Sequence, residues 1–522
     1  MNYLLTDSLE QSARKFPNKE AFVCLNHSVT FKELEQQTSQ LASVLVSRGI
    51  KKGDRIGVYM NRCLESAIAI YGIMKAGAAY VPLDPTASTS RTLNLVEDCE
   101  IACIVTTPAQ RRELKKVVEI PSSLLMIIGL SQEWQIDTIP WGHVFEQEIL
   151  DFEVGLMERD LAYIIYTSGS TGLPKGIMHS HRSGLAYAQL TANLYGITAD
   201  DRIGNHCVLH FDMSTLGYLT APLVGATTII ATDAHTKMPA SLALLLDKEN
   251  ITIWYSVPLA LIQMLSSGSI ERGSMPKLRW VLYGGETFPP QHIRSLMELW
   301  PNCTFSNVYG PAEVNQCTFF NFDTPPETDL PIPLGTFWKN TNGLIVNEDD
   351  IPVAIGEMGE LLIRSATMMS GYWRQPELTE KSLFRQRKNS GIEEVYYRTG
   401  DLVKLDAKGK LHFHGRKDRQ IKVRGYRVEL EEVAEAILKF DAVFEVTVVG
   451  IKKPDENMAI ISFITEKKGK VVDLGALNSF IKNILPKQAL PDKNLVIEAL
   501  PRTGGGKINN RQLQAEALKT YQ

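Results

Sequence analysis

The sequence predicts an α/β protein with a large N-terminal region and a small C-terminal α+β domain. Two observations carry this prediction. A chain of 522 residues is too long for one hydrophobic core, so its length favours several domains. Apolar residues also alternate between helical and strand spacing along the chain. Strands that alternate with helices of about 10–15 residues favour layered, largely parallel sheets.

The N-terminal elements follow this alternation. Residues 31–47 have the apolar spacing of a helix, and residues 55–60 are typical of a strand. A helix is expected over residues 63–75 and a strand at 79–81. The apolar run 161–165 predicts a further buried strand. We therefore expect sheets flanked by helices in the N-terminal region.

The C-terminal part of the sequence changes character. Shorter strands surround a charged turn, and a single helix follows them. This order favours a small α+β domain joined to the rest of the chain near Asp418. The expected elements are a strand at 411–416, the charged turn at 416–419, a strand at 421–423, a helix at 431–439 and a strand at 446–449.

The composition is that of an ordinary globular protein, with 44% apolar and 22% charged residues and a net charge of −4. It shows no basic excess that would indicate binding to nucleic acid or to an anionic membrane. The N-terminus lacks a signal-peptide pattern, and no run approaches the roughly 20 apolar residues of a membrane span. The seven cysteines show no paired spacing. We expect a cytoplasmic protein with no nucleic-acid or membrane partner.

A loop rich in glycine and hydroxyl side chains follows the expected strand at 161–165. It runs from Tyr166 to Gly176 and includes Lys175. Glycines let successive N–H groups turn toward one anion, while hydroxyls add donors and the lysine adds charge. The loop is neither a Walker A motif nor a dinucleotide fingerprint. It predicts a polyphosphate site of another kind, with an ordinary polar turn as the alternative.

This loop resembles the signature of the adenylate-forming superfamily, which comprises acyl-CoA ligases, luciferases and peptide-synthetase adenylation domains. Further segments resemble the family's other motifs, in the same order, over nearly the whole chain. The matching segments are residues 75–85, 166–176, 309–313, 356–361, 371–373, 397–401, 415–422, 424–429 and 501–508.

The resemblance implies a large domain over residues 1–417 and a small mobile lid over residues 418–522, with Asp418 as the hinge. Lys507 matches the family's catalytic lysine. It would stabilise the charge that develops as a carboxylate attacks the α-phosphate of ATP. A solvated lysine without a role is the alternative. Lys422 and Gly425 match the second, thioester-forming arrangement.

The resemblance also implies a nucleotide site. Asp401 would accept hydrogen bonds from both ribose hydroxyls, Arg416 would contact ribose and phosphate, and Tyr309 would stack on adenine. Glu313 is expected to bind Mg²⁺, a cation that prefers oxygen ligands, although Ala312 stands where threonine is common. The expected ATP- or AMP-binding residues are Thr167, Ser168, Gly169, Ser170, Thr171, Gly172, Lys175, Gly285, Glu286, Thr287, Asn307, Tyr309, Asp401, Phe413, Arg416 and Lys507.

Asp212 indicates the class of substrate. It lies in a segment, residues 210–216, that resembles the aromatic-Asp-x-Ser motif of amino-acid-activating adenylation domains. There the aspartate pairs with the α-ammonium group of the substrate. A buried charge is costly unless it is paired, so this carboxylate implies a cationic group in the ligand. The alternative is that Asp212 caps the helix that follows.

The family's specificity pocket maps onto mostly apolar positions. With no second charge and with Gly284 leaving room, the pocket favours a small or medium apolar amino acid. The pattern resembles free-standing enzymes that activate L-proline for a separate carrier protein, but Gln316 stands where an apolar residue is expected. The pocket positions are Asp212, Met213, Leu216, Tyr255, Leu282, Gly284, Val308, Gln316 and Cys317, together with Lys507.

We interpret the chain as an ATP- and Mg²⁺-dependent ligase. It would convert an amino acid, L-proline before others, to aminoacyl-AMP and pass the aminoacyl group to the phosphopantetheine thiol of a separate carrier protein. This reaction belongs to nonribosomal peptide or polyketide-type biosynthesis. One rival is an acyl-CoA ligase that uses free coenzyme A. The other is an inactive nucleotide-binding paralogue, which the presence of Lys507, Asp401, Arg416 and Glu313 disfavours.

Overall fold

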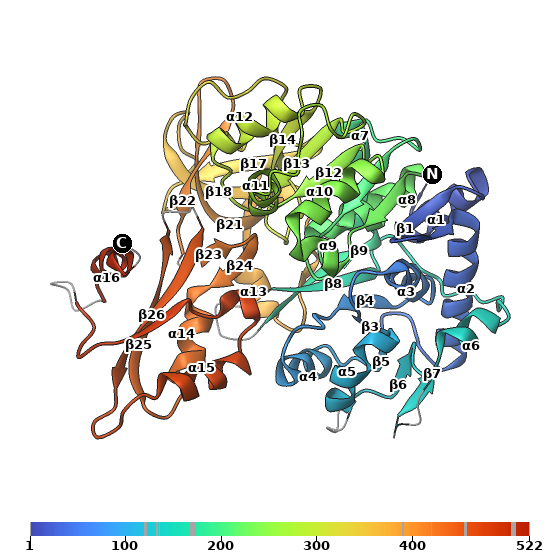
Figure 1. Cartoon of the computed structure of the whole chain (residues 1–522), viewed down its shortest axis with the longest axis horizontal. Helices are drawn as coiled ribbons and strands as arrows, with labels where there is room; N and C mark the ends of the chain where they lie inside the picture. Colours follow the sequence, from blue (N-terminus) through green and yellow to red (C-terminus); the bar gives the residue numbers. More distant parts are fainter. Residues whose placement is uncertain are drawn as a thin grey trace. The chain divides into compact units, whose positions relative to one another are not determined.

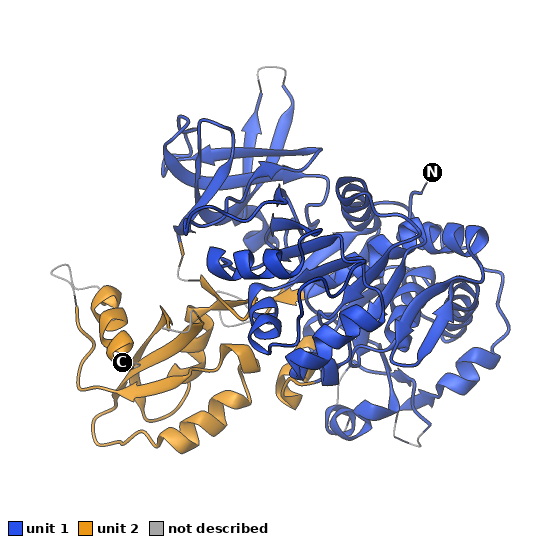
Figure 2. Cartoon of the chain, turned by 45° about the horizontal axis from the view of Figure 1, so that its top comes forward, with its two compact units in different colours: residues 1–85, 96–165, 176–417 blue, residues 86–95, 166–175, 418–522 orange. Residues whose placement is uncertain are grey.

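The computed structural model describes residues 2–118, 123–131, 134, 136–167, 174–388, 391–418, 420–453, 457–502 and 508–520. The chain forms two compact units, coloured blue and orange in Figure 2. Unit 1 comprises residues 1–85, 96–165 and 176–417, and unit 2 comprises residues 86–95, 166–175 and 418–522. The sequence analysis assigned 86–95 and 166–175 to the large domain, whereas here they group with the residues after 417.

The largest sheet has nine strands among the described residues, in the order β16-β15-β14-β13-β12-β10-β11-β1-β2. The strands from β1 to β14 in this order pair in parallel, and β2, β15 and β16 at the edges pair antiparallel. The strands are β1 (Glu20–Cys24), β2 (His27–Thr30), β10 (Arg202–Asn205), β11 (Thr227–Ile230), β12 (Ile253–Ser256), β13 (Trp280–Gly284), β14 (Thr304–Tyr309), β15 (Thr318–Phe322) and β16 (Thr336–Phe337).

A second sheet has eight described strands in the order β19-β9-β8-β4-β3-β5-β6-β7. The pairs from β8 to β7 in this order are parallel, and β19 is antiparallel to β9. Both sheets carry helices, so the predicted α/β class is confirmed. The strands are β3 (Arg55–Tyr59), β4 (Ala79–Pro82), β5 (Cys103–Thr106), β6 (Met126–Ile128), β7 (Asp137–Ile139), β8 (Leu161–Thr167), β9 (Lys175–Ser180) and β19 (Gly371–Tyr372).

The helices of this region lie between the strands in sequence, as the alternating apolar spacing predicted. They are α1 (Leu5–Lys15), α2 (Phe31–Ser47), α3 (Leu64–Lys75), α4 (Thr89–Asp98), α5 (Arg111–Val118), α6 (Trp141–Glu146), α7 (His181–Tyr195), α8 (Ala221–Val224), α9 (Asp233–Lys237), α10 (Pro239–Lys248), α11 (Pro258–Ser266), α12 (Pro290–Leu299) and α13 (Pro376–Lys381).

Local sequence explains where the first helices begin. Helix α2 starts at a capping box, in which the Glu33 N–H donates to Thr30 Oγ1 (3.2 Å) and the Thr30 N–H donates to the Glu33 carboxylate (2.8 Å). The predicted helix at 31–47 matches α2. The predictions at 55–60, 63–75 and 79–81 match β3, α3 and β4, each with one end displaced by a single residue.

The strands β12, β13 and β14 pack different partners on their two faces, because side chains alternate along a strand. Trp254, Val281 and Phe305 form a buried cluster with residues of α10, α11 and α12, helices that Figure 1 shows in front of and above these strands. Leu282 and Val308 belong to a second cluster, which includes residues of α7 and of the segment after residue 211.

A third sheet of unit 1 contains five described strands, in the order β17-β18-β21-β20 with β22 paired to β21. All of its pairs are antiparallel. The strands are β17 (Thr341–Val346), β18 (Met358–Ser365), β20 (Leu383–Arg387), β21 (Glu393–Leu405) and β22 (Leu411–Arg416).

Unit 2 has the predicted α+β character. A three-stranded sheet packs α14 against one set of its side chains, including Ile460, and α16 against the alternate set, including Ile461. A β23–β24 hairpin completes it. The elements are β23 (Gln420–Val423), β24 (Tyr426–Glu429), α14 (Leu430–Leu438), β25 (Val443–Lys452), β26 (Met458–Glu466), α15 (Leu474–Lys482), β27 (Lys493–Val496) and α16 (Asn510–Lys519). Across the described ranges, no helix combines the length and the apolar character needed to cross a membrane.

Two leucines of α10 test how much this packing stabilises unit 1. Leu246 is 0% exposed in the cluster against β12–β14, whereas Leu244 in the same helix is 66% exposed. Leu246→Ala should lower the free energy of unfolding by about 2–5 kcal/mol, because it leaves a cavity. Leu244→Ala should change it by no more than about 0.5 kcal/mol. Urea unfolding followed by circular dichroism measures both, and equal losses would contradict the assignment.

Candidate functional site

Five of the predicted substrate residues come together in one buried cluster. Met213 and Leu216 come from the segment after residue 211, Tyr255 from β12, Leu282 from β13 and Val308 from β14. None of the five is more than 6% exposed. The strand register explains the grouping, because Tyr255 pairs with Leu282 and β14 is the next strand. The cluster offers an apolar surface at the carboxyl ends of parallel strands.

Gly284 was expected to leave room for a substrate, but the structure shows another reason for glycine at this position. It pairs with Val308 across β13 and β14. A Cβ atom at position 284 would lie 2.4 Å from the carbonyl oxygen of Val308 and 3.5 Å from the hydroxyl oxygen of Tyr255. The space beside Gly284 is therefore filled by the neighbouring strand. Glycine is required here because two backbones approach closely.

Asp212 starts a short 3₁₀ turn (Asp212–Ser214), which leads into a π-helical segment (Leu216–Thr220). The N-cap residues of these elements are Phe211 and Thr215, and neither element has a side-chain capping bond. Asp212 therefore does not occupy the capping position that the alternative interpretation requires.

The half-buried carboxylate of Asp212 lies among aromatic side chains. Burial is the main cause that raises the pKa of the Tyr163, Tyr187 and Tyr255 hydroxyls, and the negative charge of Asp212 adds to it. These hydroxyls stay neutral at pH 7, and Asp212 is the acidic group beside them. Such an arrangement attracts a ligand with one positive group next to an apolar part.

The segment between β14 and β15 carries the last two pocket residues. Gln316 is 2% exposed and Cys317 is 0% exposed. The side-chain amide of Asn315 donates to Thr215 Oγ1 (3.3 Å), and this hydroxyl donates to the backbone oxygen of Asp212 (2.6 Å). The structure thus ties this segment to the turn that carries the acidic residue.

Asp401 on β21 is the centre of the predicted nucleotide site. The hydroxyl of Tyr309 donates to one carboxylate oxygen (2.5 Å), and the guanidinium of Arg416 donates to the other (2.6 Å). Asp401 and Arg416 are direct partners across β21 and β22, and Tyr309 ends β14. Asp401 is only 5% exposed, and its buried charge is compensated by these two donors.

The other predicted nucleotide residues occupy two places. Gly285, with a left-handed φ of 91°, is followed by Glu286 and Thr287 directly after β13. Asn307 lies on β14 and donates its side-chain amide to a backbone carbonyl (2.8 Å). Parallel strands of open α/β sheets bind ligands at their carboxyl ends, which is where these residues lie. Phe413 lies on β22 and is 42% exposed.

Glu313, the predicted magnesium ligand, is fully buried. The hydroxyl of Tyr372 donates to its Oε1 (2.8 Å). His179 lies nearby on β9 and hydrogen-bonds the carbonyl oxygen of Ala312 (3.0 Å). Burial lowers the pKa of His179 to about 4, so its imidazole is neutral at pH 7. Across the described ranges, no cluster of three or more His, Cys, Asp or Glu side chains is arranged to hold a metal by itself.

Lys175 starts β9 and is 7% exposed. Its Nζ lies 3.6 Å from Oε1 of Glu429, and the side-chain amide of Gln420 donates to the same oxygen (2.7 Å). All three residues belong to unit 2. The predicted phosphate ligand is thus beside a carboxylate in this structure. Thr167, which ends β8, has a buried hydroxyl with no partner in the described part of the chain.

Three predicted residues lie at the start of the C-terminal part of unit 2. The carboxylate of Asp418 accepts the N–H of Gln420 (3.2 Å). Lys422 lies on β23, and Gly425, with a φ of 82°, lies in the turn to β24. The predicted site residues that lie outside the described ranges are Ser168, Gly169, Ser170, Thr171, Gly172 and Lys507.

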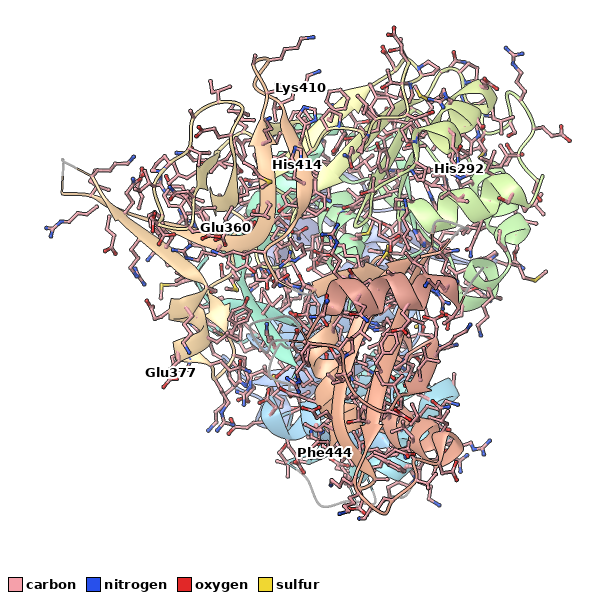
Figure 3. All side chains as sticks on the ribbon, turned by 90° about the vertical axis from the view of Figure 1, so that its left-hand side faces the viewer. His292, Glu360, Glu377, Lys410, His414 and Phe444 are labelled. Carbon is pink, nitrogen blue, oxygen red and sulfur yellow. The ribbon has the colours of Figure 1, made fainter. Side chains whose placement is uncertain are left out.

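Two residues without a role in the sequence analysis contact site residues. Tyr372 holds Glu313, as described above. Glu360 on β18, labelled in Figure 3, accepts the N–H of Gly400 (3.3 Å), the residue before Asp401. Glu360 also pairs with Arg398 (3.5 Å) and Lys417 (3.4 Å). The sequence did contain a signal for Glu360, because it directly precedes an apolar strand run. A carboxylate buried at such a position destabilises the fold unless its charge is paired.

Two family models match the chain. One is described as AMP-binding enzyme and matches residues 9–373, and the other is described as AMP-binding enzyme C-terminal domain and matches residues 432–507. An adenylation domain from Vibrio cholerae, solved with glycyl-adenosine-5'-phosphate, has the same fold. Its TM-score is 0.85 at 23% identity, over 99% of this chain and 98% of that one.

Curated relatives match over nearly the full length of this chain. An L-proline–[L-prolyl-carrier protein] ligase of Pseudomonas fluorescens is 29% identical over 97% of this chain and 98% of its own. A ligase of the same name from Streptomyces coelicolor is 31% identical over 94% of this chain and 92% of its own. Gramicidin S synthase 2 of Brevibacillus brevis is 31% identical over 98% of this chain, which spans only 11% of that synthase.

Replacing Asp401 tests the arrangement around its carboxylate. Asp401→Asn keeps the size of the side chain but removes the negative charge that faces the buried guanidinium of Arg416. It should lower the free energy of unfolding by about 3–5 kcal/mol and weaken nucleotide binding. Asp349→Asn, at an exposed position of the same unit, is the matched control. Urea unfolding and calorimetric titration with ATP measure the two effects. Wild-type stability in Asp401→Asn would refute the charge pairing.

Proposed function

The chain belongs to the AMP-binding enzyme family, and from this premise we propose that it activates an amino acid with ATP and loads it onto a separate carrier protein. A carboxylate oxygen of the amino acid attacks the α-phosphorus of ATP, and pyrophosphate leaves. The thiol of the carrier's phosphopantetheine then loses its proton and attacks the acyl carbon of the aminoacyl-AMP, so that a thioester forms and AMP leaves. The full-length relatives named as prolyl-carrier ligases support this reaction.

The observation that carries the proposal is the position of Asp212 beside the apolar cluster. A fatty or aryl acid has no positive group that could pair with the half-buried carboxylate of Asp212. An amino acid presents an α-ammonium that pairs with Asp212, while its side chain meets residues such as Leu216 and Tyr255. L-Proline is the first compound to test, because the relatives at 29% and 31% identity carry its name.

We assign the nucleotide to the residues around Asp401. In the described structure its two oxygens take the hydroxyl of Tyr309 and the guanidinium of Arg416. A bound ribose offers hydroxyl donors to the same acceptor-only group, so it would compete with these partners for the carboxylate. The residues after β13 and Asn307 on β14 would line the adenine. The phosphates would meet the loop that ends at Lys175.

The residues around Glu313 fit a magnesium ion. Mg²⁺ prefers oxygen ligands and is usually held by one or two carboxylates together with the phosphates of its substrate. Glu313 supplies one buried carboxylate, and Tyr372 fixes one of its oxygens by a 2.8 Å hydrogen bond. When bound, the cation would neutralise charge on the phosphate oxygens. Glu313 and Tyr372 hold the carboxylate in place for it.

The small domain supplies the remaining proposed roles. Lys507 would stabilise the negative charge that builds up at the α-phosphate during the first step. Asp418 would be the hinge between residues 1–417 and 418–522, and Lys422 and Gly425 would serve the thioester step. All seven cysteines are free thiols, which suits the reducing cytoplasm that we propose as the location.

Pyrophosphate exchange and thioester formation together test the proposed function. We expect exchange of labelled pyrophosphate into ATP that depends on an amino acid, with L-proline tested first among all twenty. Thioester formation should require a phosphopantetheinylated carrier protein. Turnover with free coenzyme A in place of the carrier would support the acyl-CoA ligase rival instead. Absence of exchange with every amino acid and simple acid would support an inactive paralogue.

Asp212→Ala should abolish exchange with amino acids, because the α-ammonium of the substrate would be buried without an opposite charge. The penalty is roughly 3–5 kcal/mol, which is several hundred-fold or more in affinity. An analogue without the ammonium, cyclopentanecarboxylic acid for L-proline, should lose little. Exchange rates with the two compounds measure the difference, and Asp200→Ala at an exposed position is the control. If the wild type activates the uncharged acid as well as any amino acid, the ammonium pairing is wrong.

Lys507→Ala should slow adenylate formation by on the order of 10²–10³, because one charge-stabilising group of the transition state is lost. Binding of ATP and the fold should change little. Transfer from preformed aminoacyl-AMP should be much less affected, since we assign Lys507 to the first step alone. Lys519→Ala in α16, at an exposed position, is the control. Unchanged exchange activity in Lys507→Ala would refute the assignment.

A further inference from the structure

Gln316 is buried, and among the described residues neither end of its side-chain amide has a hydrogen-bond partner. The residue is 2% exposed, and neither Oε1 nor Nε2 has a partner among the described residues. Across the described ranges, no other side chain has two such atoms. A buried polar group without partners destabilises the folded state, and an apolar side chain of the same length would avoid this cost. Packing alone therefore does not account for a glutamine here.

The position of Gln316 is set by contacts on two sides. On one side, Gly310 directly follows β14, and a Cβ placed on Gly310 would lie 2.7 Å from the Cα of Gln316. On the other side, the neighbouring Asn315 donates to Thr215 Oγ1 (3.3 Å), in the turn that carries Asp212. Gln316 thus lies between the end of β14 and this turn, which are two of the elements that form the candidate substrate site.

Two further polar atoms in this region have no hydrogen-bond partner among the described residues. Thr318 Oγ1 and Trp338 Nε1 are buried and unpaired in the described part of the chain. The backbone N–H of Trp338 donates to the carbonyl of Cys317 (2.9 Å), and its indole belongs to the same apolar cluster as Leu216. Buried polar atoms in folded proteins are nearly always paired. Gln316, Thr318 and Trp338 thus leave donors and acceptors in this region that a bound molecule would satisfy.

We propose that this molecule is the amino-acid substrate, and that its side chain carries a neutral hydrogen-bonding group, a hydroxyl or a carboxamide, which pairs with Gln316. The inference rests on the proposed function and specifies the class of its substrate. Both groups donate and accept, as the amide requires, whereas a plain aliphatic chain or ring does neither. A charged side chain would need an opposite charge, which an amide does not supply.

A site of this kind discriminates against substrates that leave its buried polar groups without a hydrogen-bond partner. When a substrate lacks the hydrogen-bonding group, the amide of Gln316 stays buried without a partner in the complex as well. Sites built to hydrogen-bond a substrate hydroxyl therefore reject the analogue without it far more strongly than an apolar pocket rejects an added hydroxyl. We expect a preference of at least about tenfold in kcat/KM for the polar member of a matched pair.

Pyrophosphate exchange with matched pairs of amino acids tests the proposal on the full chain. The pairs are trans- or cis-4-hydroxy-L-proline against L-proline, L-threonine against L-valine, and L-asparagine against L-leucine. In at least one pair, the polar member should be the best substrate of the whole set. Its kcat/KM should also be at least tenfold higher than that of its apolar partner. A set in which the apolar members are always equal or better would overturn the inference and leave amino-acid activation intact.

Gln316→Met keeps the length of the side chain and removes both polar atoms. It should reverse the order within the preferred pair, by lowering kcat/KM for the polar member at least tenfold and raising it for the apolar one. Gln291→Met, at an exposed position on α12, is the matched control and should keep the wild-type order. An unchanged ratio in Gln316→Met would show that the amide does not contact the substrate side chain.

Thermal unfolding without substrate supplies a second readout. If the amide is unpaired in the free enzyme, Gln316→Met should unfold at the same temperature as the wild type or at a higher one. A clearly lower unfolding temperature would mean that the amide is already paired in the free protein, which would overturn the inference. Absence of exchange with every amino acid would instead reject the proposed function, and this inference with it.

Discussion

The fold depends on the register of β12, β13 and β14. Side chains along these strands point alternately to the two faces of the sheet, and each face packs against a different set of residues. Trp254 and Val281 pack against α10–α12, while Tyr255 and Leu282 on the opposite face form the apolar cluster with the segment after residue 211. A shift of one residue in register would move each set of side chains to the opposite face, where it would meet the packing partners of the other set. The same strands lead into the residues proposed to bind the nucleotide at their carboxyl ends. Core stability and the position of the candidate substrate site therefore rest on one register.

Asp401 joins the two parts of unit 1 that carry the residues proposed to bind the nucleotide. Its carboxylate takes Tyr309 from the nine-stranded sheet and Arg416 from the five-stranded sheet. Within the five-stranded sheet, Glu360 accepts the backbone N–H of Gly400, the residue just before Asp401. A buried carboxylate held by two donors is rigid and charged, and these are the properties that a ligand for ribose hydroxyls requires.

Polar groups at two positions beside the apolar cluster set the proposed specificity. Asp212 provides a charge for the α-ammonium, and the unpaired amide of Gln316 provides a donor and an acceptor for the side chain. The amide of Gln316 lowers the stability of the free protein relative to an apolar residue, because it is buried without a partner among the described residues. Functional sites commonly keep such groups, since a bound ligand supplies the missing partners. The apolar cluster supplies contact area, and the polar groups decide which amino acid fits.

Local patterns in the sequence were enough to predict the elements and the family. Apolar spacing predicted α2 and β3 because side chains repeat with the period of each element, and motifs such as 397–401 identified the family because their order is specific. Three features depended on tertiary structure: the Val308 carbonyl that fills the space at Gly284, the bond from Tyr372 to Glu313, and the unpaired amide of Gln316. Each arises from segments that are brought together by strand register or chain reversal. Spacing along the sequence determines on which face of a helix or strand a side chain lies. Only the tertiary structure determines which residues contact it on that face.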